Sequence, residues 1–483
     1  EAVSYLQSAL NLLEQKEGEL PEKGRVLESL GDTKKLVGEY EDCMRYWNEA
    51  LLLWTKLQEK GKTATLHRKI ANILWDKMGD AEKAKEHHEA CSKILETEPE
   101  SVENARLYHD MAYMYWRNGD LVKALASAEK ALMLAENLNA FEVVADACLD
   151  LGVLHMFSGD FKKGREYGNR ALKTALDNGY LEIAVLAYSR VAGFLPAEEY
   201  KKFFEYLEKG LSLAEKVGDI SRQSWFFGDL AYGYVLMGEL DKAITLGEKA
   251  LALNKKVGSI AYIPGFLTTL GFAYQVLGEW SKSEQYYDEA AAISRKLTDF
   301  LPTAASHLYH GLLLFDKEEY AKARESFEEA LKIVERGGAR VTQMWFSRFL
   351  IWTLIELGEI EKATGLLDRL RTFALETEEK WVIADEMALR AMLLRAQKKY
   401  AKSIELFEKT LQEWESIKAR IWNAYYFARW VLCEYARVFL ERDQKGDREK
   451  ADKLLNQALE MFQKMGAKKD IERIIAKKKL LTA

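Results

Sequence analysis

The chain has 483 residues, and its 48% hydrophobic and 30% charged residues suit a folded protein with long solvated helix faces. Lys and Arg number 70 against 76 Asp and Glu, so the net charge of −6 gives no reason to expect a nucleic-acid partner. No window is apolar enough to span a bilayer and no signal peptide precedes Glu1, so we expect a cytoplasmic location. Four widely separated cysteines are expected to be buried free thiols in a reducing compartment: Cys43, Cys91, Cys148 and Cys433.

A short turn motif recurs along the chain at intervals of about 40 residues. A small residue stands seven positions before most turns and another stands five positions after, where small side chains let two helix backbones approach closely. So regular a period predicts an array of stacked helical hairpins. The turn positions are Gly38, Gly79, Gly119, Gly159, Gly238, Gly278 and Gly358, with Glu198, Glu318 and Lys398 where the glycine is lost.

This register resembles the tetratricopeptide repeat, whose Leu-Gly-Tyr, Gly-Asp-Tyr, Ala and Ala pattern these positions follow with substitutions in most copies. The common form has 34 residues and closes with proline. The units here are longer and lack that proline, so they look like the variety of roughly 40 residues. That variety is found in Leu-Gly-Asn-type polarity adaptors and in the C-terminal arms of signalling ATPases such as the maltose-regulon activator.

We therefore predict an all-α fold: a right-handed superhelical solenoid of about eleven hairpins, with a leading half-repeat and a C-terminal capping helix. A single superhelix would span residues 1–483. The segment 1–20 matches a second helix without its partner, which indicates a piece of a longer protein, although a lone capping helix is the alternative. Pro196 is expected to end a helix early. Regular repeats follow from 21 to 411, then an elongated last repeat over 412–465 with a long helix through 421–442, and a capping helix over 466–483.

The sequence contains no motif that indicates nucleotide binding, metal binding or catalysis. Gly61-Lys62-Thr63 looks like the end of a P-loop, but Lys56 stands where the first glycine is required and no strand precedes it. His87 and His88 point about 100° apart on a helix, and the pair His307 and His310 has no third ligand at a suitable spacing, so packing roles are expected. The sequence predicts no enzyme, no catalytic residue, no metal site and no cofactor.

The resemblance implies that first helices line a concave groove, through the positions thirteen, ten, six and three before each turn. In this register the lining is polar at first and becomes apolar and aromatic from Leu149 onward. Aromatic residues and Arg concentrate binding energy at interfaces. Tight coiling could instead bury these positions as core, and the sequence leaves both open. The predicted partner-binding residues are Arg106, His109, Tyr113, Trp116, Tyr188, Trp225, Tyr232, Phe272, Trp345, Arg348 and Trp352.

Three functions remain open. The first is a non-catalytic scaffold, part of a larger protein, that takes a protein or peptide partner in its groove. The second is the ligand-sensing arm of a signalling ATPase or transcription regulator, with a small effector in the superhelix, as the resemblance implies. The third is a carrier of an apolar small molecule, which only the apolar lining supports. Neither a nucleic acid nor a membrane is an expected partner.

Overall fold

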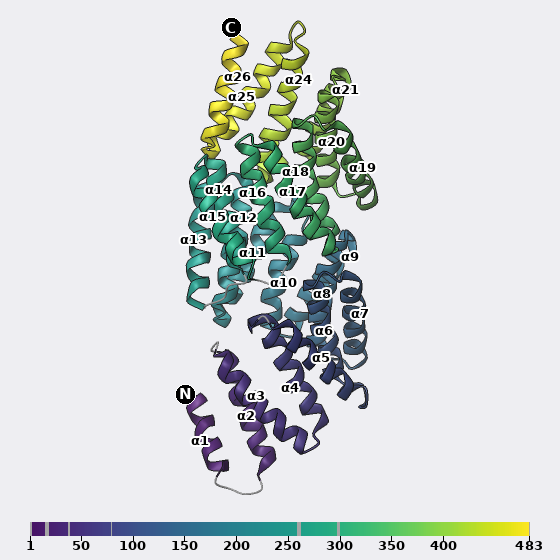
Figure 1. Cartoon of the computed structure of the whole chain (residues 1–483), viewed down its shortest axis with the longest axis vertical. Helices are drawn as coiled ribbons and strands as arrows, with labels where there is room; N and C mark the ends of the chain where they lie inside the picture. Colours follow the sequence, from purple (N-terminus) through teal and green to yellow (C-terminus); the bar gives the residue numbers. More distant parts are fainter. Residues whose placement is uncertain are drawn as a thin grey trace. The chain divides into compact units, whose positions relative to one another are not determined.

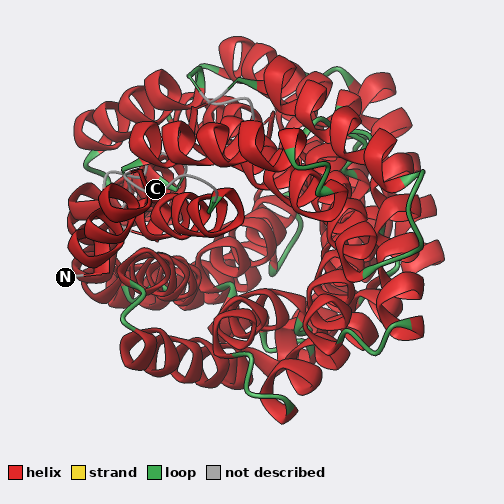
Figure 2. Ribbon diagram, turned by 90° about the horizontal axis from the view of Figure 1, so that it is seen from below, coloured by secondary structure: helices red, strands yellow, loops and turns green. Residues whose placement is uncertain are grey.

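The computed structural model describes residues 2–14, 19–36, 39–78, 80–257, 262–296 and 300–482. Within these ranges the elements are helices joined by short loops, with no strand (Figure 2). This confirms the predicted all-α repeat fold. The chain divides into two compact units, Glu1–Trp116 with Val122–Leu151 and Arg117–Leu121 with Gly152–Ala483, which we describe separately as unit 1 and unit 2.

Unit 1 consists of successive antiparallel hairpins (Figure 1). Helix α1 packs on α2, α2 on α3 and α4 on α5. Tyr5 and Leu12 on α1 are 77% and 63% exposed. The elements are α1 (Ala2–Glu14), α2 (Leu20–Leu36), α3 (Tyr40–Lys56), α4 (Lys60–Ile73), the π-helix η1 (Leu74–Met78), α5 (Ala81–Leu95), α6 (Val102–Arg117), α7 (Leu121–Asn137) and the first part of α8 (Phe141–Ser158).

Unit 2 continues the pattern, and each first helix also contacts the first helix of the next repeat, from α10 through α12, α14, α16 and α18 to α20. Its first helices are α10 (Leu181–Phe194), α12 (Ile220–Met237), α14 (Ile263–Leu277), α16 (Phe300–Asp316), α18 (Arg340–Glu356) and α20 (Lys380–Ala396). The second helices are α9 (Phe161–Asp177), α11 (Tyr200–Val217), α13 (Leu240–Val257), α15 (Trp280–Ser294), α17 (Tyr320–Arg336), α19 (Ile360–Thr377) and α21 (Tyr400–Ser416).

Small residues seven positions before the turn receive a side chain from the second helix of the same repeat. A Cβ added at Gly271 would lie 2.4 Å from the ring of Tyr287, and one at Gly311 would lie 2.6 Å from Phe327. Both rings stand nine residues after their turns and are 1% exposed. In these two repeats the small residue therefore marks the place where the hairpin closes around one large buried ring.

The turn itself places one residue in the left-handed region of backbone space. Gly238, Gly278 and Gly358 have φ of 77°, 81° and 73°. Glu318 and Lys398, which replace the glycine, keep φ at 62° and 60°. The backbone geometry of the turn is thus conserved between repeats even where the residue is not suited to it. The expected turns at Gly38 and Gly79 lie outside the described residues.

The irregular repeat at Pro196 ends as expected: α10 stops at Phe194 and the 3₁₀-helix η2 (Ala197–Glu199) follows. The predicted long helix over 421–442 differs from the structure. That stretch is helical but divided, with a break at Asn423 and a π-helical segment. Its pieces are α22 (Ala419–Trp422), α23 (Ala424–Tyr426), η3 (Phe427–Cys433) and α24 (Glu434–Arg442), after which α25 (Asp447–Met465) and α26 (Lys468–Thr482) close the chain.

Helices far apart in sequence meet inside unit 2. Phe161 on α9 has its ring centroid 6.5 Å from those of both Phe373 and Trp381. Phe203 on α11 lies 4.9 Å from Trp422 on α22. The division at Asn423 has a consequence for packing, because it allows α23 and η3 to lie against α14, α16 and α18 as well as against their sequence neighbours.

Candidate functional site

A ladder of charged side chains joins successive first helices of unit 1. The Nζ atom of Lys69 on α4 lies 3.0 Å from Glu28 and 2.9 Å from Asp32, both on α2. Arg106 on α6 pairs with Glu142 on α8 at 2.8 Å. The partners are separated by about one repeat of sequence because each first helix stands beside the next one. We call this surface, formed by α2, α4, α6 and α8, the first-helix face of unit 1.

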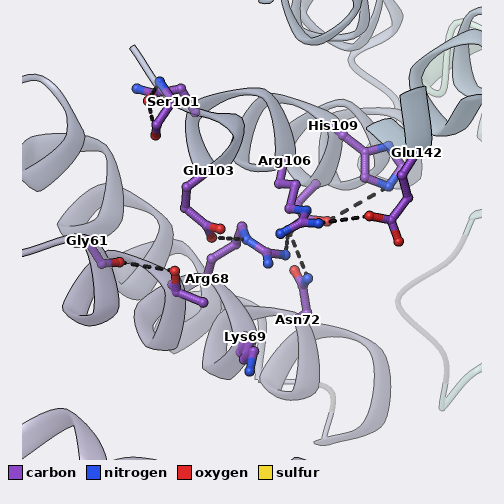
Figure 3. Close-up of polar contacts among 12 residues, drawn as sticks. Gly61, Arg68, Lys69, Asn72, Ser101, Glu103, Arg106, His109 and Glu142 are labelled. Atoms are coloured by element: carbon purple, nitrogen blue, oxygen red, sulfur yellow. Dashed lines mark hydrogen bonds and ion pairs between the residues drawn. The ribbon is translucent and has the colours of Figure 1, made fainter. Parts of the chain in front are cut away.

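Arg68 is the centre of the ladder (Figure 3). It forms an ion pair with Glu103 and another with Asp110, the latter at 2.8 Å. Asn72 donates a hydrogen bond to the same Asp110 carboxylate at 2.9 Å. Burial would raise the pKa of Asp110, but the charges of Arg68 and His109 outweigh it and lower that pKa. The Asp110 carboxylate is therefore held in its ionised form.

His109 carries the next step of the ladder, with Nδ1 2.6 Å from Asp150 on α8. Burial would lower the pKa of His109, but the carboxylates of Asp150, Asp146 and Asp110 outweigh it and raise the pKa to about 10. The imidazole is thus a cation at neutral pH. Burial raises the pKa of Asp146 to about 6, assisted by the charges of Asp150 and Glu142 and opposed by that of His109.

Four predicted binding residues share this face of α6. Arg106, His109, Tyr113 and Trp116 follow one another at three- and four-residue steps, so they lie on one side of the helix. All four are half-buried. The rings of Tyr113 and Trp116 are 6.2 Å apart. The structure therefore places these predicted residues together, beside the carboxylates of α8.

In unit 2 the predicted residues Tyr188, Trp225 and Tyr232 are also half-buried. Tyr188 packs edge-on against Tyr206 at 5.8 Å. Trp225 has the better-defined surroundings: its ring stacks on Tyr262 at 4.9 Å and lies near two guanidinium groups. Burial raises the pKa of Tyr232, with the charge of Arg348 acting in the opposite direction.

The remaining predicted residues, except the half-buried Trp345, are covered by the chain itself. Phe272, Arg348 and Trp352 are 4%, 5% and 6% exposed. The Trp352 ring contacts Trp430 of η3 at 5.5 Å, and the Arg348 guanidinium lies 5.3 Å from the same Trp430 ring. Arg348 also pairs with Asp385, another buried residue. These three side chains belong to the packed interior of unit 2 and offer no surface to a partner in this structure.

Three aspartates that connect neighbouring first helices were not among the predicted residues. Asp110, Asp150 and Asp229 all stand nine positions before their turn, and each accepts a hydrogen bond or an ion pair from a neighbouring first helix. The signal was available, since Asp recurs at one register position of three repeats. The groove register of the family includes the position ten residues before the turn but not the position nine before it. The aspartates were missed for that reason.

Unit 2 also has an open cleft of about 690 Å³ where the turn between α12 and α13 faces α22 and α25. Three methionines contribute to its lining. The residues around it are Met237, Gly238, Glu239, Leu240, Asp241, Lys242, Arg420, Ile421, Ala424, Glu460, Met461, Lys464 and Met465.

The motifs that sequence analysis set aside have structural roles. Gly61 lies within α4, so the segment Gly61-Lys62-Thr63 is helical. His67 and His87 face each other with their Nδ1 atoms 3.0 Å apart, while His88 is 4% exposed. In the described ranges, no group of three or more His, Cys, Asp or Glu side chains is arranged to hold a metal ion. Nor does any helix in those ranges have the length and apolarity needed to cross a membrane.

The stacked hairpins define a helical-repeat protein. Residues 62–137 and 263–336 match the family model of the tetratricopeptide repeat. These two segments therefore contain tetratricopeptide repeats, as the turn register predicts. Comparison with curated proteins gave no match.

Several solved structures are similar over long stretches. A Rap protein complexed with competence and sporulation factor is 13% identical, with a TM-score of 0.49, over 70% of this chain and 99% of that one. A signal transduction ATPase with a tetratricopeptide repeat sensor from Pyrococcus horikoshii is 16% identical, with a TM-score of 0.39, over 72% of this chain and 56% of that one. Yeast Tom70 is 16% identical, with a TM-score of 0.34, over 95% of this chain and 97% of that one.

Proposed function

We propose that this protein is a non-catalytic scaffold that binds a peptide segment of a partner protein on the first-helix face of unit 1. Arrays of this kind use the side formed by their first helices as an extended binding surface. The partner would lie across α4, α6 and α8, with Tyr113 and Trp116 as apolar contacts and the charged ladder fixing its orientation.

The observation that carries the proposal is the arrangement of Asp146. Its carboxyl group lies within the fields of His109 and Asp150, and within the described residues it forms no hydrogen bond or ion pair. Among the residues of the charged ladder and Asp146 beside it, carboxyl groups outnumber cations: Glu28, Asp32, Glu103, Asp110, Glu142, Asp146 and Asp150 stand against Arg68, Lys69, Arg106 and the protonated His109. A Lys or Arg of the partner placed beside Asp146 would supply the missing positive charge.

The other functions considered from the sequence receive less support from unit 2. A carrier of an apolar molecule needs the apolar lining to be open, but Phe272, Arg348 and Trp352 are packed under residues 424–433. A sensing arm would use the same first-helix face with a small effector in place of the peptide. A thermal shift with small metabolites in the absence of any peptide would favour that alternative.

The test selects peptides from a random display library by their binding to the full chain. We expect the selected peptides to carry Lys or Arg near an apolar residue. Asp146→Asn should weaken their binding about tenfold, the loss expected for one charge-assisted contact. Trp116→Ala should weaken it as well. Glu129→Gln, an exposed carboxyl on α7, is the matched control. Wild-type affinity in both Asp146→Asn and Trp116→Ala would exclude this face as the binding site.

A further inference from the structure

Trp225 on α12 is the centre of a second cluster, which lies in unit 2 and which the proposed function does not use. Its ring stacks on Tyr262 with centroids 4.9 Å apart and planes inclined by 23°. The guanidinium carbon of Arg190 on α10 lies 4.5 Å from the ring centroid, and that of Arg222 lies 4.8 Å away. Two cations therefore share one indole, whose electron-rich ring attracts both.

The carboxyl group of Asp229 contacts several members of the cluster. Asp229, one helical turn after Trp225, accepts a hydrogen bond from the hydroxyl of Ser189 on α10 at 2.8 Å. Burial raises the pKa of Asp229 to about 6, against the lowering effects of the Ser189 hydrogen bond, the charge of Arg190 and a hydrogen bond from Trp225. The contacts of Asp229 connect α10 to α12 and restrict the indole, so the ring is a rigid support for the guanidinium groups.

The guanidinium N–H donors of Arg222 are available to a ligand. Within the part of the chain that the structure describes, its side chain forms no hydrogen bond and no ion pair, and its guanidinium lies over the Trp225 ring. The Arg222 backbone N–H donates to Asp219, the N-cap of α12, at 2.8 Å, which fixes the start of the helix. A guanidinium carries five N–H donors in a planar fork, and stacking on a ring does not use them.

The Arg222 guanidinium has no anionic partner among the described residues. The carboxyl groups of the cluster serve other donors, because Asp219 accepts from the backbone N–H of Arg222 and Asp229 accepts from the hydroxyl of Ser189. All of Arg190, Arg222, Trp225 and Tyr262 are half-buried, so the fork of Arg222 is partly shielded from solvent and still reachable. A partly buried cation without an anionic partner attracts one, because the reduced dielectric strengthens the pairing.

From this geometry we propose that Arg222 binds an oxyanion of an acidic peptide segment. The Trp225 ring supports the Arg222 guanidinium, and Arg190 adds a second positive charge over the same ring. The carboxylate of a Glu or Asp side chain matches the planar fork in a bidentate arrangement. A phosphate on a phosphorylated residue shares that chemistry and is distinguished by the experiment below. Trp, Tyr and Arg are the residue types that dominate binding energy at interfaces, and all three meet here. The site is independent of the first-helix face of unit 1.

The experiment titrates the full chain into a labelled peptide that contains a run of glutamates, and it measures binding by fluorescence anisotropy. The same peptide with glutamines, and one with phosphoserines, are the other two probes. We expect the glutamate peptide to bind and the glutamine peptide not to bind. Arg222→Gln should weaken the glutamate peptide at least tenfold, and Arg222→Lys, which keeps the charge and loses the fork, should weaken it by a smaller factor.

Arg371→Gln on α19 is the matched control, because Arg371 is exposed and distant in sequence from the cluster. Far-ultraviolet circular dichroism and the thermal midpoint verify that each variant is folded. Binding of the phosphoserine peptide alone, with the same loss in Arg222→Gln, would assign the oxyanion to phosphate. The proposal fails if no acidic peptide binds, if the glutamine peptide binds equally well, or if Arg222→Gln and Arg371→Gln behave alike.

Discussion

Arg429 of η3 and Asp316, the last residue of α16, form a buried ion pair across 113 residues of sequence. Their side chains are 13% and 4% exposed. Gln275 of α14 donates to the same Asp316 carboxylate at 2.6 Å, and Tyr425 accepts a hydrogen bond from Arg429 at 2.9 Å. This pair fixes the divided helix 419–442 against the first helices of unit 2, and it explains why the predicted groove residues there are covered.

Removing the arginine from this pair should destabilise unit 2 strongly. In Arg429→Met the Asp316 carboxylate would remain buried without its cation, and Asp470, 3.6 Å from Arg429, would keep only Arg473 as a cationic partner among the described residues. Breaking a buried pair in this way costs about 3–5 kcal/mol. Arg448→Met is the control, because Arg448 and its partner Asp443 are 60% and 64% exposed and such pairs contribute about 0–1 kcal/mol. Urea unfolding measures the free energy of unfolding of both variants. Equal losses in Arg429→Met and Arg448→Met would contradict the expectation.

Two turn substitutions should change stability in opposite directions. Lys398 adopts φ of 60°, which costs a non-glycine residue about 1 kcal/mol, so Lys398→Gly should stabilise the protein by up to that amount. Gly358 adopts φ of 73°, and a Cβ there would meet no atom within 4 Å. Gly358→Ala should therefore lose about 1 kcal/mol through backbone strain alone. A shift of both thermal midpoints in the same direction would show that the turn conformation is not what sets these energies.

The turn register is the part of the structure that sequence reasoning predicted best. Its period is local information: a glycine at the turn, a small residue seven positions earlier and another five positions later specify one hairpin. Glu318 has φ of 62° at the position where Gly278 has 81°, so even a copy without glycine was correctly placed. The members of the ladder, such as His109 and Asp150, were predicted only in part, because the register names helix positions and not the partners that face them.

The covering of Arg348 and Trp352 could not be predicted from the repeat pattern. Both stand at register positions that line a groove in the family, and nothing in the residues near them differs from an open lining. The cause lies elsewhere in the chain, where the break at Asn423 brings Trp430 within 5.5 Å of Trp352. Periodicity describes contacts between neighbouring repeats, and this contact joins elements that are not neighbours.

Trp352 should therefore behave as a core residue. Its ring contacts Phe315 at 4.3 Å as well as Trp430, and it is 6% exposed. Truncation to alanine would leave a cavity at a cost of about 3–5 kcal/mol. Trp345→Ala is the comparison, because Trp345 is half-buried and should lose less. Guanidinium unfolding monitored by circular dichroism measures both, and equal losses would mean that Trp352 is no better packed than Trp345.

The pair of His109 and Asp150 should make the stability of unit 1 depend on pH in the alkaline range. The pKa of His109 is raised to about 10 in the folded chain and is about 6.5 in an unfolded one. Because the folded state holds the proton more tightly, the pair stabilises fully below about pH 6.5. That stabilisation is lost as the pH rises through the folded value toward 10. Its size is on the order of 3 kcal/mol after allowing for the 26% exposure of the imidazole.

The measurement compares the free energy of unfolding of the wild type and His109→Gln between pH 6 and pH 10. Taking the difference removes the titration of lysines and tyrosines, which the two proteins share. We expect a large difference at pH 6 that shrinks steadily as the pH rises, because glutamine cannot carry the charge that Asp150 stabilises. Asp150→Asn should produce the same profile, since it removes the other member of the pair. A difference that stays constant over this range would show that His109 is neutral in the folded protein. The positive charge assigned to the first-helix face would then be absent.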